Sequence, residues 1–261
     1  MKAIRKIIAG IVLFYAPLQT MAWGTNGHRI SGQIAENHLS EKAKAAIKAV
    51  LGNESIAMAS NWGDFIKSDP NFKSYDPWHY IDLEDIHSRN GLTAYLKNDT
   101  TTNLYSRVTF LTAQLKKKTT TKANKLLYLK MLIHLVEDMH QPLHTTGHES
   151  GGNGIKLKWF NEETNLHTIW DSKLINFQEL SYTEYVRSID FTTKAQIKKW
   201  QSTSVSDWLY ESNVLADKIT AEAKPGQTLS YNYNFKYKEI LNQQLLKGGV
   251  RLAGLLNQIF G

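Results

Sequence analysis

The chain has 261 residues, no cysteine and a formal net charge of +7 at neutral pH, from 31 lysines and arginines against 24 aspartates and glutamates. The absence of cysteine excludes a disulfide framework, so that a bound metal is the obvious alternative means of stabilisation. A modest positive charge does not by itself indicate a nucleic-acid partner. The length is enough for one substantial hydrophobic core, and no repeat, proline-rich linker or composition break divides it.

The first 22 residues have the composition of a secretory signal peptide. "MKAIRK" is positively charged, "IIAGIVLFYA" is an apolar run, and "TMA" has small residues at the −3 and −1 positions of a cut after Ala22. The apolar run is too short for the roughly 20 residues of a membrane span, which disfavours a membrane anchor or a buried N-terminal helix. We therefore expect a secreted or periplasmic mature protein, residues 23–261, without stable membrane association. Its net charge is +4, because cleavage removes three of the basic residues.

Helical periodicity dominates the mature chain. The predicted helices, in chain order, are 29–51, 54–67, 91–97, 102–116, 122–140, 164–176, 193–222 in one or two pieces, and 235–259. Two stretches lack this pattern, 68–85 and 145–163, and the second is predicted to carry a short hairpin at 155–160. "KKKTTTK" (116–122) is interpreted as a loop rather than a phosphate-binding patch, with Thr121 as the N-cap of the next helix. The sequence thus predicts a single all-α domain with two long irregular segments.

The stretch "HLVEDMHQPLH" (134–144) combines three histidines and two acidic residues at the end of an apolar helix. His134 and Asp138 are four residues apart and share the apolar face of that helix. "NLHTIWD" repeats this spacing with His167 and Asp171, again beside apolar residues. A buried imidazole or carboxylate without a partner is costly. Two such pairs in one domain therefore favour metal binding over core packing.

Other nitrogen and oxygen donors occur near these pairs in the sequence. Pro142 turns the chain after the helix, so that His144 leaves the helix face. The remaining donors are Asp64 in "NWGD", His79 and Asp82 in "WHYID", and His28 and the amine of Trp23 in "WGTNGH". Imidazole and carboxylate ligands without cysteine are typical of zinc in a hydrolytic site with open coordination positions.

These motifs resemble the zinc-dependent single-strand nucleases and 3′-nucleotidases of the S-one/P-one type, which are distant relatives of bacterial zinc phospholipase C. Six motifs occur in the order of that family: "WG…GH", "WGD", "WHYID", "HLVEDMHQPLH", "GGN" and "LHTIWD". They extend from Trp23 to Asp171. The remaining third, 172–261, carries no motif and is compatible with further helices.

The resemblance implies a mostly helical phospholipase C/nuclease-like fold with three zinc ions per chain at the base of a cleft. By likeness, one ion would be held by Asp64, His79, His134 and Asp138, a second by the Trp23 amine nitrogen and carbonyl oxygen, His28 and Asp138, and a third by His144, His167 and Asp171. Asp138 would therefore bridge two ions. The eukaryotic members carry disulfides, and the lack of cysteine here points to a bacterial exported protein in which zinc supplies more of the stability.

The resemblance also implies catalytic and substrate-binding residues. Asp64 would orient or deprotonate the attacking water, and Lys67, one helical turn on, would help to hold phosphate rather than be an exposed lysine. Tyr80 would stack on a base that Asp82 holds by a hydrogen bond. A stacked, unpaired base cannot belong to a duplex, which explains a preference for single strands. Asn153 in "GGN" would form a hydrogen bond to the substrate.

Several residues near the motifs have no ligand role in this scheme. His140 is interpreted as structural or as a support for the ligands, and His148 as a surface histidine rather than a substrate contact. Glu137 faces away from Asp138 and is expected to point to solvent or to support a ligand. His38 and His87 match no ligand of the family.

The function implied is a secreted endonuclease that hydrolyses phosphodiester bonds of single-stranded RNA and DNA to 5′-phosphate products, with 3′-nucleotidase activity. Single-stranded nucleic acid and nucleotides would be its substrates, and the protein would be a monomer. One alternative is a zinc phospholipase C, which Asp171 in place of a glutamate and the pair Tyr80 and Asp82 disfavour. The other is a non-catalytic zinc-stabilised binding protein, which leaves Lys67, Tyr80 and Asp82 unexplained.

Overall fold

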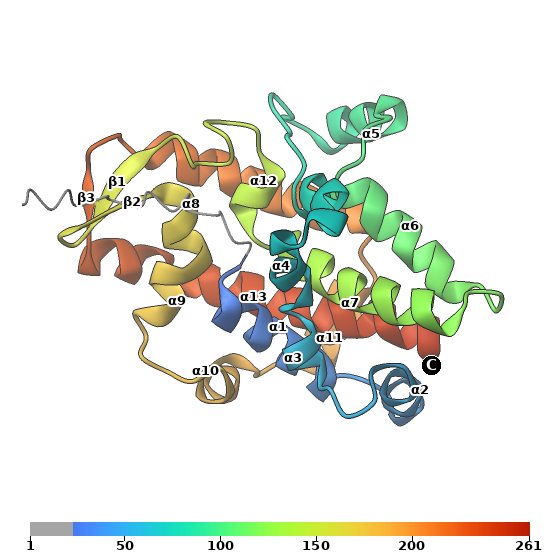
Figure 1. Cartoon of the computed structure of the whole chain (residues 1–261). Helices are drawn as coiled ribbons and strands as arrows, with labels where there is room; N and C mark the ends of the chain where they lie inside the picture. The colour runs from blue at the N-terminus through green and yellow to red at the C-terminus, as the bar shows by residue number, and fades with distance from the viewer. Residues whose placement is uncertain (1–22) are drawn as a thin grey trace, which may run out of the picture.

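The computed structural model describes residues 23–261. They form a mostly helical molecule with one small sheet at one end (Figure 1), which confirms the predicted fold class. The predicted signal peptide, residues 1–22, lies outside the described residues. None of the helices within residues 23–261 has the length and hydropathy that a membrane span needs.

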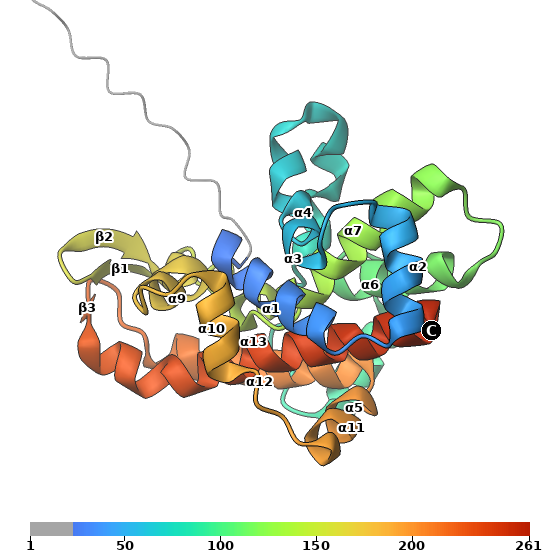
Figure 2. The ribbon, with the colours of Figure 1, turned by 90° about the horizontal axis from the view of Figure 1, so that it is seen from below.

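The longest helix, α13 (Tyr231–Phe260), runs the length of the molecule, and helix α1 (Thr25–Asn37) lies along it (Figures 1 and 2). The two helices approach closely at Gly249, where an added Cβ would lie 2.6 Å from the Cβ of Ile34. Any larger side chain there would push the helices apart. Helix α1, which carries His28, is therefore held against α13 at a fixed distance.

Two further helices surround the segment 134–144. Helix α7 (Lys122–Asp138) begins at Thr121, whose hydroxyl accepts a hydrogen bond from the amide of Asn124 at 3.2 Å, which confirms the predicted N-cap. Helix α7 is followed by the 3-10 helix η3 (Pro142–Thr145), which begins at a proline and packs against α12 (Val205–Glu222). The chain thus leaves α7 in a short turn that α12 covers.

The remaining helical segments are shorter. In chain order they are α2 (Glu41–Leu51), α3 (Ile56–Ala59), α4 (Trp62–Phe65), the 3-10 helices η1 (Ile66–Ser68) and η2 (Pro70–His79), α5 (Arg89–Asn98), α6 (Leu104–Lys116), α8 (Leu166–Thr168), the π-helix η4 (Ile169–Lys173), α9 (Leu174–Asn176), α10 (Tyr182–Ile189) and α11 (Lys194–Gln201). Most of them fall within the predicted segments, and 193–222 forms two pieces, α11 and α12.

Some predicted boundaries were wrong. The segment 29–51 is two helices, because the side chain of Ser40 accepts a hydrogen bond from the amide of Ala43 and starts a new helix, α2. The segment 54–67 is divided into α3, α4 and η1, and 68–85, predicted to be irregular, contains the 3-10 helix η2. Helix α10 was not predicted. These breaks place short, sharply turning elements around the ligand motifs.

The sheet has three short strands in the order β2-β1-β3. Strand β1 (Lys156–Trp159) pairs antiparallel with β2 (Glu162–Asn165) and parallel with β3 (Thr228–Leu229). The hairpin predicted at 155–160 is present but longer, and β2 takes the first residues of the predicted helix 164–176. Because β2 leads directly into α8, the sheet fixes the start of the segment with the second His–Asp pair.

Candidate metal centre

The interior contains an unusual number of histidines. Six of the nine are at most 7% exposed, and the carboxylates of Glu137, Asp138 and Asp171 are buried among them. Helices α1, α7 and α8 and the short helices η2 and η3 supply five of these imidazoles, and His140 lies in the turn between α7 and η3. Burial of so many polar groups is costly unless each has a partner or a metal ion.

Five of these residues form what we call the inner group: His28, Asp64, His79, His134 and Asp138. Asp138 lies at its centre. One carboxylate oxygen of Asp138, Oδ2, is 2.9 Å from Nδ1 of His79 and 3.2 Å from Nε2 of His134, and the other, Oδ1, is 3.4 Å from Nε2 of His28. Asp64 Oδ2 is 3.9 Å from Nε2 of His28. The two oxygens of Asp138 thus face different imidazoles, as a bridging carboxylate requires.

The outer group consists of His144, His167 and Asp171. Asp171 Oδ2 is 3.1 Å from Nε2 of His167, and Oδ1 is 3.8 Å from Nε2 of His144. The rings of His144 and His167 stack with centroids 5.0 Å apart. His167 and Asp171 lie on either side of the junction between α8 and the π-helix η4, yet their separation matches that of His134 and Asp138.

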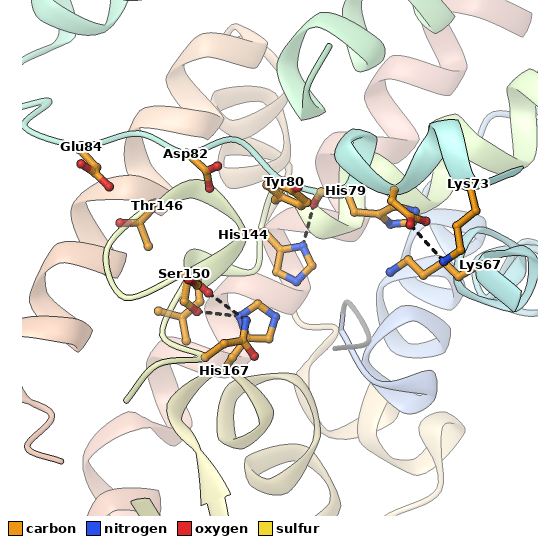
Figure 3. A pocket seen from close by; sticks show the side chains of 15 residues that line it. Lys67, Lys73, His79, Tyr80, Asp82, Glu84, His144, Thr146, Ser150 and His167 are labelled. Carbon is orange, nitrogen blue, oxygen red and sulfur yellow. Dashed lines mark hydrogen bonds and ion pairs between the residues drawn. The ribbon is translucent and has the colours of Figure 1, made fainter. Parts of the chain in front are cut away.

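Backbone carbonyls orient three of the imidazoles. His134 donates from Nδ1 to the carbonyl of Ser60 at 2.6 Å. In the same way, His144 donates to the carbonyl of His79 at 2.8 Å and His167 to that of Gly151 at 2.7 Å, and Figure 3 shows these two bonds. Each bond fixes the tautomer and leaves Nε2 directed at the group. This is the usual arrangement of metal-binding histidines.

Glycines make two of these contacts possible. An added Cβ at Gly63 would lie 2.5 Å from Cδ2 of His134, so only glycine leaves room for that ring. Gly151 has φ +62, and an added Cβ would lie 2.7 Å from Leu143 O. Glycine adopts this left-handed conformation without strain and aims its carbonyl at His167.

The donor atoms fit metal ions. Among residues 23–261, the buried atoms without a hydrogen-bond partner include Nε2 of His28, Nε2 of His144, both carboxylate oxygens of Asp64 and Oδ1 of Asp138. Three triads have ligand atoms within 4.8 Å of one another: His28, Asp64 and His134; His79, His134 and Asp138; and His144, His167 and Asp171. Their nitrogen and oxygen donors are ligands that zinc accepts. The triads join Asp64 to His28 rather than to His79, with which the resemblance had grouped it.

Electrostatics keep these groups ready to bind a cation. Burial lowers the pKa of His28 well below its ordinary value and brings the pKa of His144 to about 3, so both imidazoles are neutral. Burial opposes ionisation of Asp138, but the charge of His134 and hydrogen bonds from His134 and His79 outweigh it and hold the pKa of this carboxyl well below its usual range. Burial raises the pKa of Asp171 to about 6. Neutral imidazoles and ionised carboxylates are the forms that bind metal.

A pocket of about 530 Å³ opens onto both groups, and His79, His144 and His167 line it. Figure 3 shows Lys67 and Lys73 at one end and Asp82 and Glu84 at the other. The two lysines have carboxylate partners, Asp64 at 2.7 Å and Asp76 at 3.2 Å. Tyr80, which is 44% exposed, and Asn153 also line this pocket. All the residues predicted to contact substrate therefore lie around one cavity.

Lys67 lies against Asp64, as its spacing predicted. Its Nζ is 2.7 Å from Asp64 Oδ1, and its side chain is only 16% exposed. The alternative of an exposed helix lysine is therefore wrong. The amide of Asn153 donates to Ser150 O at 2.9 Å, while its Oδ1 has no partner among the described residues.

Trp23 lies between the two groups. Its indole Nε1 donates to Glu137 O at 2.9 Å, and the next amide, that of Gly24, donates to Asp171 O at 2.7 Å. The side chain is fully buried. Trp23 and Gly24 thus contact residues beside both groups, and the role of the Trp23 amine as a ligand after cleavage stays a prediction.

Glu137 has the supporting role that the sequence left open, and Gln141 has a role that the sequence did not reveal. Glu137 is fully buried, and its Oε2 is 2.6 Å from Nδ1 of His28, so it supports that imidazole rather than facing solvent. Gln141 Nε2 donates to Asp171 Oδ1 at 2.5 Å. Neither contact has a local signal, because each joins segments far apart in the chain. His140 is buried and bonded to Val136 O, in accord with a structural role.

The other histidines lie away from both groups. His148 is 42% exposed and lies 4.0 Å from Asp217, as expected of a surface histidine. His38 forms a separate contact, Nε2 to Asp190 Oδ1 at 2.7 Å. Neither belongs to the triads within residues 23–261.

Several known proteins are similar to this chain over most of its length. A family model described as S1/P1 Nuclease matches residues 23–261. The chain is 30% identical to Endonuclease 2 of Arabidopsis thaliana, over 98% of this chain and 96% of that protein. It is 26% identical to Nuclease S1 of Aspergillus oryzae, over 92% of each chain, and 27% identical to Nuclease P1 of Penicillium citrinum, over 92% and 98%. Among solved structures, Alpha Toxin from Clostridium Absonum matches with a TM-score of 0.49 and 17% identity, over 91% of this chain and 63% of that chain.

Proposed function

The chain belongs to the S1/P1 nuclease family and is a hydrolase acting on nucleic acid, and we propose that it is a secreted or periplasmic, zinc-dependent endonuclease of single-stranded RNA and DNA. Its products would be 5′-phosphates, and it would also act as a 3′-nucleotidase and function as a monomer. The observation that carries this proposal is a set of buried histidine and aspartate atoms without hydrogen-bond partners, among them Nε2 of His28 and of His144. They lie beside a pocket that has lysines at one end and Asp82 and Glu84 at the other.

Three zinc ions per chain are proposed. The ligands would be Asp64, His79, His134 and Asp138 for one ion, Trp23, His28 and Asp138 for another, and His144, His167 and Asp171 for the third. When bound, the ions lower the pKa of a shared water toward about 7 and stabilise charge on the phosphoryl oxygens. The unpartnered Nε2 atoms of His28 and His144 support this assignment.

We assign two roles at the scissile phosphate to residues of η1 and α4. Asp64 orients the attacking water and accepts its proton through Oδ2, which is buried and has no hydrogen-bond partner among the described residues, while Oδ1 lies against Lys67. Lys67, whose Nζ is 2.7 Å from Asp64, donates hydrogen bonds to a phosphate oxygen and offsets its negative charge. The buried surroundings strengthen both interactions, because few waters compete with them.

We assign base binding to the other end of the pocket. The half-exposed ring of Tyr80 offers a face for stacking, and the carboxylate of Asp82 accepts hydrogen bonds from the base edge. Burial and the nearby charge of Glu84 raise the pKa of Asp82, as expected of a carboxylate that awaits a donor. Asn153 contributes a further polar contact from the loop before β1.

The test combines metal counting with product analysis on the mature protein, residues 23–261. We expect three zinc ions per chain by elemental analysis, cleavage of single-stranded RNA and DNA far faster than of duplexes, and products with 5′-phosphate ends. Release of diacylglycerol from phosphatidylcholine, with no nucleotide release, would instead establish a phospholipase. A protein that binds three zinc ions and cleaves neither substrate would be a binding protein.

The role of Trp23 has its own test, because only a free amine can be a ligand. A form that carries one extra methionine before Trp23 should bind one zinc ion fewer than the mature protein. Three zinc ions in the extended form would show that the amine is not a ligand. Chelation of the mature protein should also lower its Tm, because zinc binds the folded state.

A further inference from the structure

The C-terminal third of the chain, 172–261, carries no motif, yet it buries a few polar side chains. Within this range, all of which the structure describes, the polar or charged side chains under 9% exposed, apart from tyrosine and tryptophan, are Ser212, Asn213, Gln244 and Arg251, each at most 2% exposed. Helices α12 and α13 carry two each. Burying such groups is unfavourable unless each finds a partner. All four contact a single segment, 139–145.

Three of these side chains bond to backbone carbonyls of that segment. Ser212 Oγ donates to Met139 O at 2.6 Å, Gln244 Nε2 to His140 O at 2.9 Å, and Asn213 Nδ2 to Thr145 O at 2.8 Å. Met139 and His140 follow Asp138, the last residue of α7, and Thr145 ends η3. Because these carbonyls are buried, the three side chains replace the water that would otherwise satisfy them.

The fourth side chain, Arg251, holds the imidazole in the middle of the segment. Its Nη1 lies 3.2 Å from Nε2 of His140, and its Nη2 donates to Glu211 Oε2 at 2.8 Å. Arginine is only a donor, so His140 Nε2 accepts and Nδ1 carries the hydrogen that it donates to Val136 O. The positive charge also lies at the carboxyl end of α7, where the helix dipole favours it.

The segment 139–145 connects the two metal groups. It begins directly after Asp138 of the inner group and includes His144 of the outer group. It also includes Gln141, whose amide donates to Asp171 of the outer group. A shift of this turn would therefore move two contacts of the outer group and leave α7, with His134 and Asp138, in place.

We propose that Ser212, Asn213, Gln244 and Arg251 are positioning residues that set the separation between the inner and outer groups by holding the turn 139–145. This inference rests on the proposed function, since the two groups are taken to bind zinc. None of the four touches the substrate pocket or a ligand atom. Their effect on chemistry passes through the backbone of the turn.

The decisive variants are Gln244→Met and Ser212→Ala, which keep the side chain similar in size or smaller. The first removes the bond to His140 O, the second removes the bond to Met139 O, and each also removes the bond between Gln244 Nε2 and Ser212 Oγ. The matched controls are Gln243→Met, whose amide bonds only to the exposed Glu239, and Ser206→Ala, whose hydroxyl meets Ser204 on the surface. Each protein is loaded with zinc and titrated with a competing chelator at a temperature where it is fully folded. Cleavage of single-stranded DNA is measured in parallel.

In Gln244→Met and Ser212→Ala we expect one of the three zinc ions to be bound about tenfold more weakly, the two others as in the wild type, and kcat to fall more than KM changes. The controls should retain all three affinities. Leu246→Ala, a core truncation on the same helix, serves as a second comparison. It should lower the Tm at least as much without a selective loss of one ion.

Two results would overturn the inference: unchanged zinc affinities in both decisive variants, or a uniform loss of all three ions that also appears in Leu246→Ala. Arg251→Met should show the same selective loss to a greater extent. If that variant does not fold, the two milder variants still decide. A wild-type protein without three zinc ions or without cleavage would contradict the proposed function instead, so the two failures are distinguishable.

Discussion

The inner and outer groups are built on the same spacing but differ in their surroundings. His134 and Asp138 approach to 3.2 Å on a regular α-helix, and His167 and Asp171 approach to 3.1 Å across an α-to-π junction. Asp138 lies within 4 Å of four imidazoles, whereas Asp171 lies within that distance of two. The four-residue spacing therefore brings one histidine and one aspartate together, and the packing of other elements determines how many further imidazoles lie near the aspartate.

This difference appears in the ionisation of the two carboxyls. Both are buried, which raises a carboxyl pKa. At Asp138 the neighbouring imidazoles outweigh burial, and the pKa lies well below its ordinary value, while at Asp171 burial prevails and the pKa rises to about 6. Asp138 is therefore ionised over a wider pH range than Asp171.

The largest effect is expected at Asp138. In Asp138→Asn the bridging charge is lost, so we expect two of three zinc ions to be lost and kcat/KM to fall at least about 10³-fold, the equivalent of several kcal/mol. Zinc content and cleavage of single-stranded DNA measure this. Retention of all three ions would mean that Asp138 does not bridge.

Asp171→Asn should have a smaller and more local effect. We expect loss of one zinc ion, that of the outer group, and a fall in kcat/KM of about 10²-fold, since the inner group remains intact. The matched control is Asp217→Asn, a carboxylate 38% exposed near His148 that contacts neither group. If Asp171→Asn lost two ions, the outer group would not be separate from the inner one.

Gly63→Ala tests the inner group without removing a ligand. The new Cβ would lie 2.5 Å from the ring of His134, so the ring must shift, and overpacking of this kind costs about 1–3 kcal/mol of stability. We expect weaker zinc binding by the inner group and unchanged binding by the outer group. The control is Gly91→Ala, which also lies in a helix. There the nearest atom to the new Cβ is Ser88 Oγ, at 3.3 Å. Equal effects in the two variants would contradict this account.

The smallest effect is expected at a His–Asp contact outside both groups, His38 with Asp190. Hydrogen bonds from His38 and Asn37 outweigh partial burial and lower the pKa of Asp190. A depressed carboxyl pKa stabilises the fold above the unfolded value, and this stabilisation is lost as pH falls through the folded value. Asp190→Asn should therefore cost under about 1 kcal/mol near neutral pH, and the difference should begin to shrink as the pH falls below about 4 and vanish below the folded pKa.

Thermal unfolding of the wild type and Asp190→Asn from pH 7 to pH 3 measures this difference. It should be the same before and after chelation, because this pair binds no metal. If this difference in stability disappeared on chelation, His38 and Asp190 would be coupled to metal binding, and this account would be wrong.

The sequence predicted which histidines and aspartates lie side by side, because their pattern is local. A separation of four residues puts His134 beside Asp138 in any helix, and the same separation puts His167 beside Asp171. The N-cap at Thr121 and the turn at Pro142 are likewise properties of a few neighbouring residues. Zinc as the metal and the catalytic roles of Asp64 and Lys67 remain predictions that the proposed experiments test.

The sequence by itself determined the helical character of the chain, the two His–Asp pairs and the order of the motifs, because these depend on periodicity and short spacings. Only the tertiary structure decided which side chains hold the imidazoles and the turn 139–145 in place. Glu137 meets His28 across 109 positions, and Gln244 meets the carbonyl of His140 across 104. No local rule encodes such contacts, since they arise when helices pack. The four side chains that hold the turn 139–145 therefore could not be identified from the sequence of 172–261, which carries no motif.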